Sequence, residues 1–188
     1  MDSSTLYLFP TVIKYHTQIV SEKECLNAIK KCKKCKYKNH GTFNKNAVTS
    51  FDKNFSILNK LPSLKKIITE KIKNYCNELG IYEVNLGNSW VNFQFKNSKL
   101  AKHTHPRAQV SGVIYLKTDI KSSKIAFYNP NPYNLMLDKK EFNNNNFDIR
   151  YFYPKTGDLI LFPGWLSHGS NDEENLSDER IALSFNAE

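Results

Sequence analysis

The sequence predicts a mainly β domain with flanking helices, in which two packed sheets carry two N-terminal helices on one outer face. From residue 90 onward, short alternating segments recur between polar turns, as is typical of an antiparallel sandwich or barrel. Before residue 80, apolar residues recur instead at helical spacing. At 188 residues the chain is most simply one domain. We expect 1–188 to be a single unit, with 1–80 as a helical support arm and 81–188 as the core that holds the site.

Two helices are expected in the first 80 residues. Ser21 and Glu24 have the spacing of a capping box, which predicts a helix that runs to about Lys34. The second helix should span 63–79 and stop at Gly80. The residues expected on the inner sides of the two helices are Cys25, Leu26, Ile29 and Cys32, and then Leu64, Ile67, Ile68, Ile72 and Cys76.

Strands account for most of the remaining chain. We expect them at 90–96, 109–117, 124–128, 148–153, 157–162 and 180–185, with a short one at 47–51 and a loop at 36–46. Residues 6–15, which include Pro10, suit an edge strand or an extended lead-in. On the last strand, alternation separates Ile181, Leu183 and Phe185 from the face that carries Arg180 and Ser184.

The net charge of +9 is unevenly distributed. Residues 1–80 hold 15 lysines against 6 acidic residues, whereas the two signs balance in 81–188. The basic half, 1–80, could attract nucleic acid. Only Tyr37 is aromatic within 30–38, which does not suggest stacking on single strands. Lysines on solvated helix faces also explain the charge. The chain opens without a signal peptide and no apolar run is long enough to span a bilayer, so we expect no membrane partner and a cytoplasmic location.

Four cysteines lie in the basic half. Cys32 and Cys35 have the CxxC spacing of zinc and redox sites, but no second such pair follows. Neighbouring lysines would lower the pKa of a thiol and make it reactive. The incomplete motif favours reduced cysteines on or near a helix.

Three of the five histidines are candidates for a metal site. His103 and His105 point the same way if their segment is extended, and His168 could join them from another strand end. Imidazole binds Fe, Zn, Cu and Ni, so the spacing does not name the metal. Arg180, on the inner side of a strand with small and polar residues, predicts an anion site beside it.

Five segments carry a resemblance to a known family: 90–92, 103–106, 111–116, 162–168 and 180–186. Taken together, they resemble the 2-oxoglutarate/Fe(II)-dependent oxygenases, and most closely an uncharacterised branch common in marine bacteria and phages. The resemblance extends over essentially the whole chain. It implies a double-stranded β-helix (jelly-roll) core. For a phage protein, the location would be the host cytoplasm.

The resemblance also implies the roles of individual residues. Fe(II) would be bound by a facial triad that includes His168, with 2-oxoglutarate chelating the iron and Arg180 binding the far carboxylate of that cosubstrate. Tyr115, Ser184 and Asn92 are further candidates for contact with 2-oxoglutarate. Molecular oxygen would be consumed, succinate and CO2 released, and an unidentified substrate hydroxylated, with ascorbate as a reductant.

His105 departs from the family pattern, which has Asp or Glu at that position. All three histidines could bind the metal, one of the pair could leave its position to water or substrate, or one could lie outside the ligand set. We expect the first arrangement, with His103, His105 and His168 as ligands. Two rival functions remain: a cupin-like three-histidine metalloenzyme without 2-oxoglutarate, and a non-catalytic basic binding module on the same fold.

Overall fold

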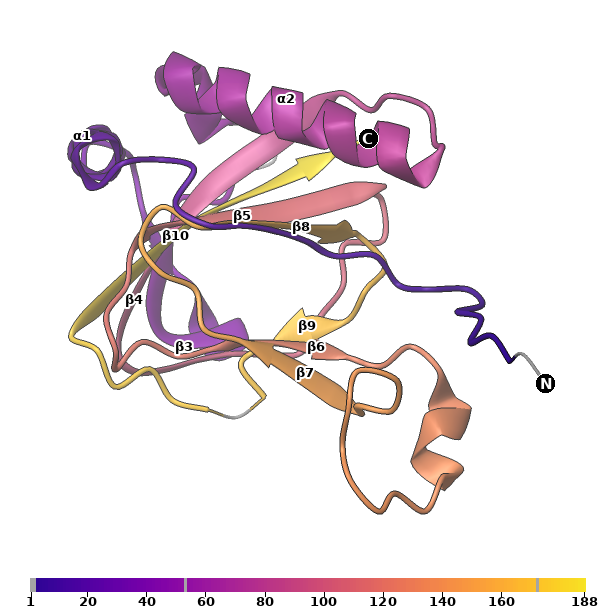
Figure 1. Cartoon of the computed structure of the whole chain (residues 1–188). Helices are drawn as coiled ribbons and strands as arrows, with labels where there is room; N and C mark the ends of the chain where they lie inside the picture. The colour runs from indigo at the N-terminus through magenta and orange to yellow at the C-terminus, as the bar shows by residue number, and fades with distance from the viewer. Residues whose placement is uncertain (1–2, 53, 172) are drawn as a thin grey trace.

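Two antiparallel sheets face each other, and both helices lie on the outer side of the larger sheet (Figure 1). The computed structural model describes residues 3–52, 54–171 and 173–188. The larger sheet consists, in spatial order, of β1 (Lys14–His16), β8 (Leu159–Pro163), β5 (Val110–Lys117), β10 (Glu179–Ala187), β4 (Leu86–Leu100), β3 (Asn44–Thr49) and β2 (Lys38–Asn39). The smaller sheet consists of β7 (Ile149–Phe152), β6 (Ile125–Tyr128) and β9 (His168–Gly169). This architecture confirms the predicted mainly β fold with two helices packed outside.

The two helices begin and end where local chemistry requires. α1 (Glu22–Cys32) starts at a capping box, in which the Ser21 side chain accepts from the Glu24 backbone N–H and the Glu24 carboxylate accepts from the Ser21 N–H. α2 (Pro62–Leu79) begins at a proline, whose missing N–H costs nothing in a first turn. It ends at Gly80, which has a left-handed φ of 65°.

The buried stripe of α1 differs from the expected one at a single position. Cys25, Ala28, Ile29 and Cys32 are buried, but Leu26 is 59% exposed. With about 3.6 residues per turn, Leu26 lies roughly a quarter of a turn beyond Cys25 and misses the sheet. Placing Leu26 on the inner side was therefore wrong.

Strands extend further into the first half than expected. The predicted loop at 36–46 contains β2, the 3-10 turn η1 (Gly41–Phe43) and the start of β3. β1 covers only the end of the segment 6–15 and lies at an edge of the larger sheet. The first 80 residues thus supply three strands as well as two helices and the 3-10 turn η2 (Ile57–Lys60); a further 3-10 turn, η3 (Pro132–Met136), follows β6.

The larger sheet separates two apolar clusters. The outer cluster lies between the helices and the sheet and includes Leu183 of β10 and Ile68 of α2. The inner cluster lies between the two sheets and includes Tyr115, Phe127 and Ala182. Since β10 contributes to both clusters in alternation, its polar inner residues face the space between the sheets. Among the described residues, no helix is long and apolar enough to cross a membrane.

Replacing Gly112 of β5 with alanine should destabilise the fold. An added Cβ would lie 2.3 Å from Cζ of Phe185 and 2.8 Å from Cδ2 of Leu161, inside the outer cluster. Overpacking of this kind typically costs about 1–3 kcal/mol. Urea denaturation of Gly112→Ala should show that loss. Gly87→Ala is the matched control, because its Cβ would meet nothing nearer than 3.4 Å. Equal stability of the two variants would contradict the packing described.

His16 should make the fold sensitive to acid. Its pKa is lowered by burial and then by Lys71 and Lys14, with Glu78 opposing, and its Nε2 is buried without a hydrogen-bond partner among the described residues. As the pH falls below the unfolded value of about 6.5, the unfolded chain takes up this proton first, so stability is lost. His16→Gln should lose less free energy of unfolding than the wild type between about pH 7.5 and about pH 5.5. Equal losses in urea titrations would argue against this role.

Candidate metal centre and anion site

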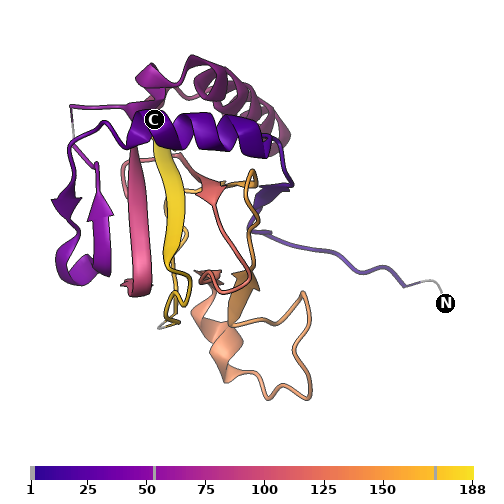
Figure 2. The same ribbon diagram turned by 90° about the vertical axis from the view of Figure 1, so that its left-hand side faces the viewer.

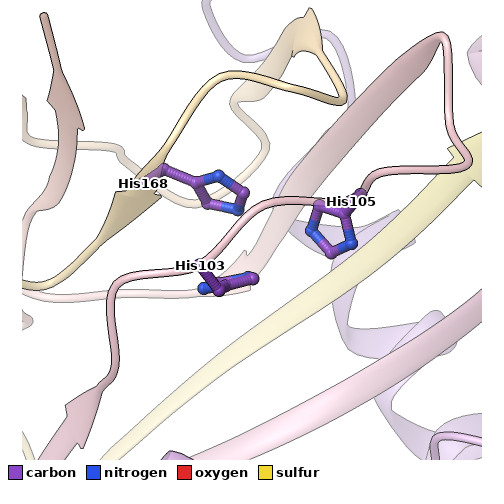
Figure 3. Close-up of side chains that lie close together, drawn as sticks. All are labelled: His103, His105 and His168. Carbon is purple, nitrogen blue, oxygen red and sulfur yellow. The ribbon is translucent and has the colours of Figure 1, made fainter. Parts of the chain in front are cut away.

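Three histidines from two segments of the chain meet between the sheets (Figure 3). One nitrogen from each of His103, His105 and His168 can be chosen so that all three lie within 4.8 Å of one another. Backbone pairing fixes two of them, because the His103 N–H donates to the His168 carbonyl at 2.9 Å and the His168 N–H donates back at 3.0 Å. The structure therefore brings together all three histidines that the sequence singled out.

His105 is held by the loop that follows β8. Its backbone N–H donates to the carbonyl of Gly164 at 2.7 Å, and its carbonyl accepts from the Ala108 N–H at 3.0 Å. A Cβ on Gly164 would lie 2.1 Å from the Ala108 oxygen and 2.8 Å from the His105 oxygen. Only a glycine permits this approach, so the break at Pro163 and Gly164 positions the histidine segment.

Hydrogen bonds select the nitrogen that each ring offers. Nδ1 of His103 lies 2.8 Å from the Ala101 carbonyl oxygen, and Nδ1 of His168 lies 2.9 Å from the Leu166 carbonyl oxygen. A carbonyl can only accept, so both Nδ1 atoms carry the proton and donate. Nε2 of each neutral ring is then the free lone pair, as is usual for histidine ligands oriented by a second hydrogen bond.

Burial keeps the three rings neutral. It lowers the pKa of His103, lowers the pKa of His105 to about 4, and lowers the pKa of His168 well below its usual value. Mutual repulsion adds to the effect at His105 and His168. Neutral imidazole is the form that binds a metal ion. Three such donors fit Fe(II) and other borderline metals without naming one of them.

The histidines line a cavity of about 700 Å³ that extends between the sheets. The inner faces of β4, β10 and β5 form one wall, through Asn92, Gln94, Arg180, Ser184 and Tyr115. β10 is paired with β4 on one side and β5 on the other, and it reaches the cavity with the alternate residues Arg180, Ala182, Ser184 and Asn186. The cavity therefore combines an end lined by three histidines with a polar wall.

Arg180 is a buried cation that no carboxylate neutralises within the described ranges. The residue is 5% exposed and forms none of the ion pairs found there. Its Nη1 donates to Oε1 of Gln94, and its guanidinium carbon lies 4.9 Å from the centre of the Tyr115 ring. Its Nε is buried without a hydrogen-bond partner among the residues that the structure describes. Burial lowers the pKa of Arg180, and Tyr115 opposes that shift.

An anion is the natural complement of this arrangement. A guanidinium remains charged at neutral pH even when its pKa is depressed, and a buried charge without a counter-ion is costly. The unpaired Nε and the fork geometry of the group suit a carboxylate. The surroundings of Arg180 are compatible with the anion site expected from the sequence, and that site stays a prediction.

The other three predicted contacts also lie on the cavity wall. Burial raises the pKa of Tyr115 to about 12, so its hydroxyl stays protonated and can donate to an anion. Ser184 lies two residues from Ala182 on the inner face of β10. Asn92 is 8% exposed, and its Oδ1 is buried without a hydrogen-bond partner in the described chain.

Sequence reasoning missed Gln94 and the rim of the cavity. Gln94 lies directly opposite Arg180 in the β4–β10 register, and its place on the face of Asn92 was a usable signal. At the rim, Phe43 packs against His103 with ring centres 4.8 Å apart, and Phe51 packs against Trp90 at 5.1 Å. The loops at 128–133 and 143–146 do not contribute to this lining.

The CxxC pair belongs to the fold rather than to this site. Cys32 is fully buried in the outer cluster, and burial raises the pKa of its thiol to about 12. The shift is opposite to the lowering that would make a thiol reactive.

Comparison with known proteins identifies a family and a set of similar folds. The family model described as "Putative 2OG-Fe(II) oxygenase" matches residues 88–186, just over half of the chain. Among curated proteins, no sequence matches significantly. Three of the similar solved structures are from bacteria and cover most of this chain. A 2OG-Fe(II) oxygenase family oxidoreductase from Burkholderia pseudomallei has a TM-score of 0.68 and 13% identity, covering 94% of this chain and 83% of that one.

The two other structures extend the comparison of fold. HygX from Streptomyces hygroscopicus, solved with nickel and 2-oxoglutarate bound, has a TM-score of 0.64 and 11% identity, with coverage of 93% and 82%. A Pseudomonas putida prolyl-4-hydroxylase has a TM-score of 0.63 and 12% identity, with coverage of 94% and 92%. At such identities these structures show a shared jelly-roll fold, as the sequence resemblance implied.

Replacing Gly164 with alanine should weaken metal binding without removing a ligand. The added Cβ must displace the segment that carries His105 and Ala108. Disturbing the atoms that orient a metal ligand typically lowers affinity by about 10–100-fold. Calorimetric titration of the metal-free protein with Ni(II), a redox-inert substitute for Fe(II), should show that loss. Gly87→Ala, an ordinary contact at 3.4 Å, is the control. Unchanged Ni(II) affinity in Gly164→Ala would contradict the proposed positioning.

Proposed function

Because the chain belongs to the 2-oxoglutarate/Fe(II)-dependent oxygenase family, we propose that His103, His105 and His168 hold Fe(II) and that Arg180 binds 2-oxoglutarate. We further propose that 1–188 acts as one domain, since the helices share a single apolar cluster with the larger sheet. Succinate and CO2 are released, and an unidentified substrate is hydroxylated. The chain carries out this reaction between its two sheets.

One observation carries the proposal: a buried guanidinium, without a counter-ion in the described part of the chain, shares a cavity with three neutral imidazoles. The imidazoles offer lone pairs to a cation, and the guanidinium offers N–H groups to an anion. A dicarboxylate that chelates a metal through one end and pairs with an arginine through the other satisfies both. 2-Oxoglutarate has that chemistry.

Bound Fe(II) would supply the redox chemistry in which one oxygen atom of O2 enters succinate and the other enters a C–H bond of the substrate. The residues of this chain provide geometry and electrostatics. Gln94 orients Arg180 by accepting from its Nη1, and Tyr115 lies against the guanidinium with a hydroxyl that stays protonated. Ser184 and Asn92 supply further polar groups on the same wall. Ascorbate would serve as the reductant in an assay.

His105 is proposed as the third ligand. Its ring centre lies 5.0 Å from that of His103 and 5.2 Å from that of His168, and burial keeps it neutral. A site with three neutral ligands retains one more positive charge than a site with two histidines and a carboxylate. The same three histidines would suit a metalloenzyme that does not use 2-oxoglutarate, so the cosubstrate requires a direct test.

Arg180→Ala should abolish tight binding of 2-oxoglutarate. Removing one partner of a buried charged pair costs about 2 kcal/mol or more, which corresponds to a loss of about 30-fold or more in affinity. The measurement is calorimetric titration of the Ni(II)-loaded protein with 2-oxoglutarate, alongside succinate formation with Fe(II) and ascorbate. Arg180→Lys should also bind weakly, because an ammonium cannot form the bidentate pair. Ser184→Ala, a smaller change on the same face, should lose less.

Two outcomes would reject this function. If the wild type loaded with metal neither binds nor consumes 2-oxoglutarate, the metalloenzyme without that cosubstrate replaces it. If Arg180→Ala binds 2-oxoglutarate like the wild type, Arg180 is not the anion contact.

The ligand set is tested by single histidine replacements. His103→Ala, His105→Ala and His168→Ala should each lower Ni(II) affinity by at least about 100-fold, because each removes a metal–nitrogen bond. Circular dichroism checks that each variant remains folded. Wild-type affinity in His105→Ala alone would show that His105 lies outside the ligand set.

A further inference from the structure

A second hollow, lined by lysines, adjoins the candidate active-site cavity. This groove has a volume of about 480 Å³ and is lined by residues in and next to β2 and β3. These two strands lie at one edge of the larger sheet (Figure 2). Phe51 lines both the groove and the cavity, so the two are neighbours. Four exposed lysines line the groove: Lys34, Lys36, Lys38 and Lys60. We call it the lysine groove.

The charge of the lysine groove is largely uncompensated. Asp52 is the one acidic residue among the described residues that line the groove. Within the described ranges, none of the four lysines forms an ion pair with a carboxylate. Lys34 and Lys36 lie between α1 and β2, Lys38 begins β2, and Lys60 ends η2. Folding brings these separate positions together. Positive charge that is concentrated in a concave surface attracts a polyanion. This favours a binding role for these lysines over the interpretation that they only face solvent.

Aromatic rings are interleaved with these lysines. Tyr37, Phe51 and Phe55 line the groove and are each partly exposed. Lys38 Nζ lies 5.7 Å from the centre of the Phe51 ring, and Lys60 Nζ lies 5.2 Å from the centre of the Phe55 ring. Tyr37 is the one aromatic residue within the segment 30–38. Phe51 and Phe55 lie later in the sequence, and folding brings them next to the lysines.

We propose that the lysine groove binds single-stranded nucleic acid and leads a base of that strand into the cavity. Oxidation of the base would rest on the proposed function, whereas binding of the strand to the groove does not. Lysines that follow a backbone and rings that stack on bases are the two elements of sequence-tolerant single-strand binding. Beyond Phe51, the cavity offers Trp90 and the 40%-exposed Phe43, which lies against His103. A planar base could stack there beside the metal end.

A single strand fits this arrangement better than a duplex or an acidic peptide. An enzyme that oxidises a base must receive it unstacked, and the rings provide an alternative stack. An acidic peptide would use the lysines but gain nothing from Tyr37, Phe51 and Phe55. The comparison of these ligands is therefore part of the test.

The experiment is a fluorescence anisotropy titration of the full chain, without added metal or 2-oxoglutarate. The probe is a fluorescein-labelled single-stranded oligonucleotide of about 20 nucleotides. Binding should weaken between about 50 and about 200 mM salt. The triple variant Lys36→Gln, Lys38→Gln, Lys60→Gln should bind about tenfold or more weakly. Each lost phosphate contact lowers the magnitude of the slope of log affinity against log salt concentration by about 0.7, so the three losses together should lower it by about 2. Phe51→Leu should weaken binding with little change in that slope.

A matched triple variant separates local from total charge. Lys66→Gln, Lys140→Gln, Lys155→Gln removes the same charge at exposed positions outside the groove and should bind like the wild type. Three results would overturn the inference: no wild-type binding of the oligonucleotide, equal losses in both triple variants, or equally tight binding of a poly-glutamate peptide of matched length. Because 2-oxoglutarate binding is measured separately, failure here leaves the proposed function standing.

Discussion

The alternation of β10 is the constraint on which both the core and the candidate site depend. Ile181, Leu183 and Phe185 close the outer cluster beneath the helices, while Arg180 and Ser184 face the cavity. A register slip of one residue would exchange the two sets and bury Arg180 against the helices. The apolar packing that stabilises the sheet therefore also aims the cation. Pairing with β4 and β5 on both sides removes the freedom to slip.

The sequence was sufficient where the signal is local. Capping residues, the left-handed glycine and the alternation of β10 predicted the two helices, the last strand and the face of Arg180. It singled out three histidines that meet in the fold, but it missed other contacts between residues that are distant in sequence. Gln94 is opposite Arg180 only through the β4–β10 register, and Phe51 and Phe55 join the lysines only in the fold. Leu26 was misplaced because a helix stripe is narrower than its apolar content suggests.

Charge links the metal centre to what surrounds it. As ligands, three neutral imidazoles would leave the full positive charge of a divalent ion uncompensated, and Arg180 adds another positive charge to the cavity. The described lining contains one carboxylate residue, Glu188, at the opposite end of the chain from the helices. Anionic ligands must supply most of the balance. Such a site would bind anions more tightly than one with a carboxylate ligand. In return, its metal ion would lack the stabilisation that a charged protein ligand provides.

The edges of the larger sheet have a consequence of a different kind. β1 and β2, the two outermost strands, are three and two residues long, and both residues of β2 are exposed. Long bare edges invite strand addition by other chains, and short edges with lysine side chains discourage it. A seven-stranded sheet that forms one wall of the cavity thus offers little backbone for aggregation. Lys38 contributes to that protection from the same edge that borders the groove.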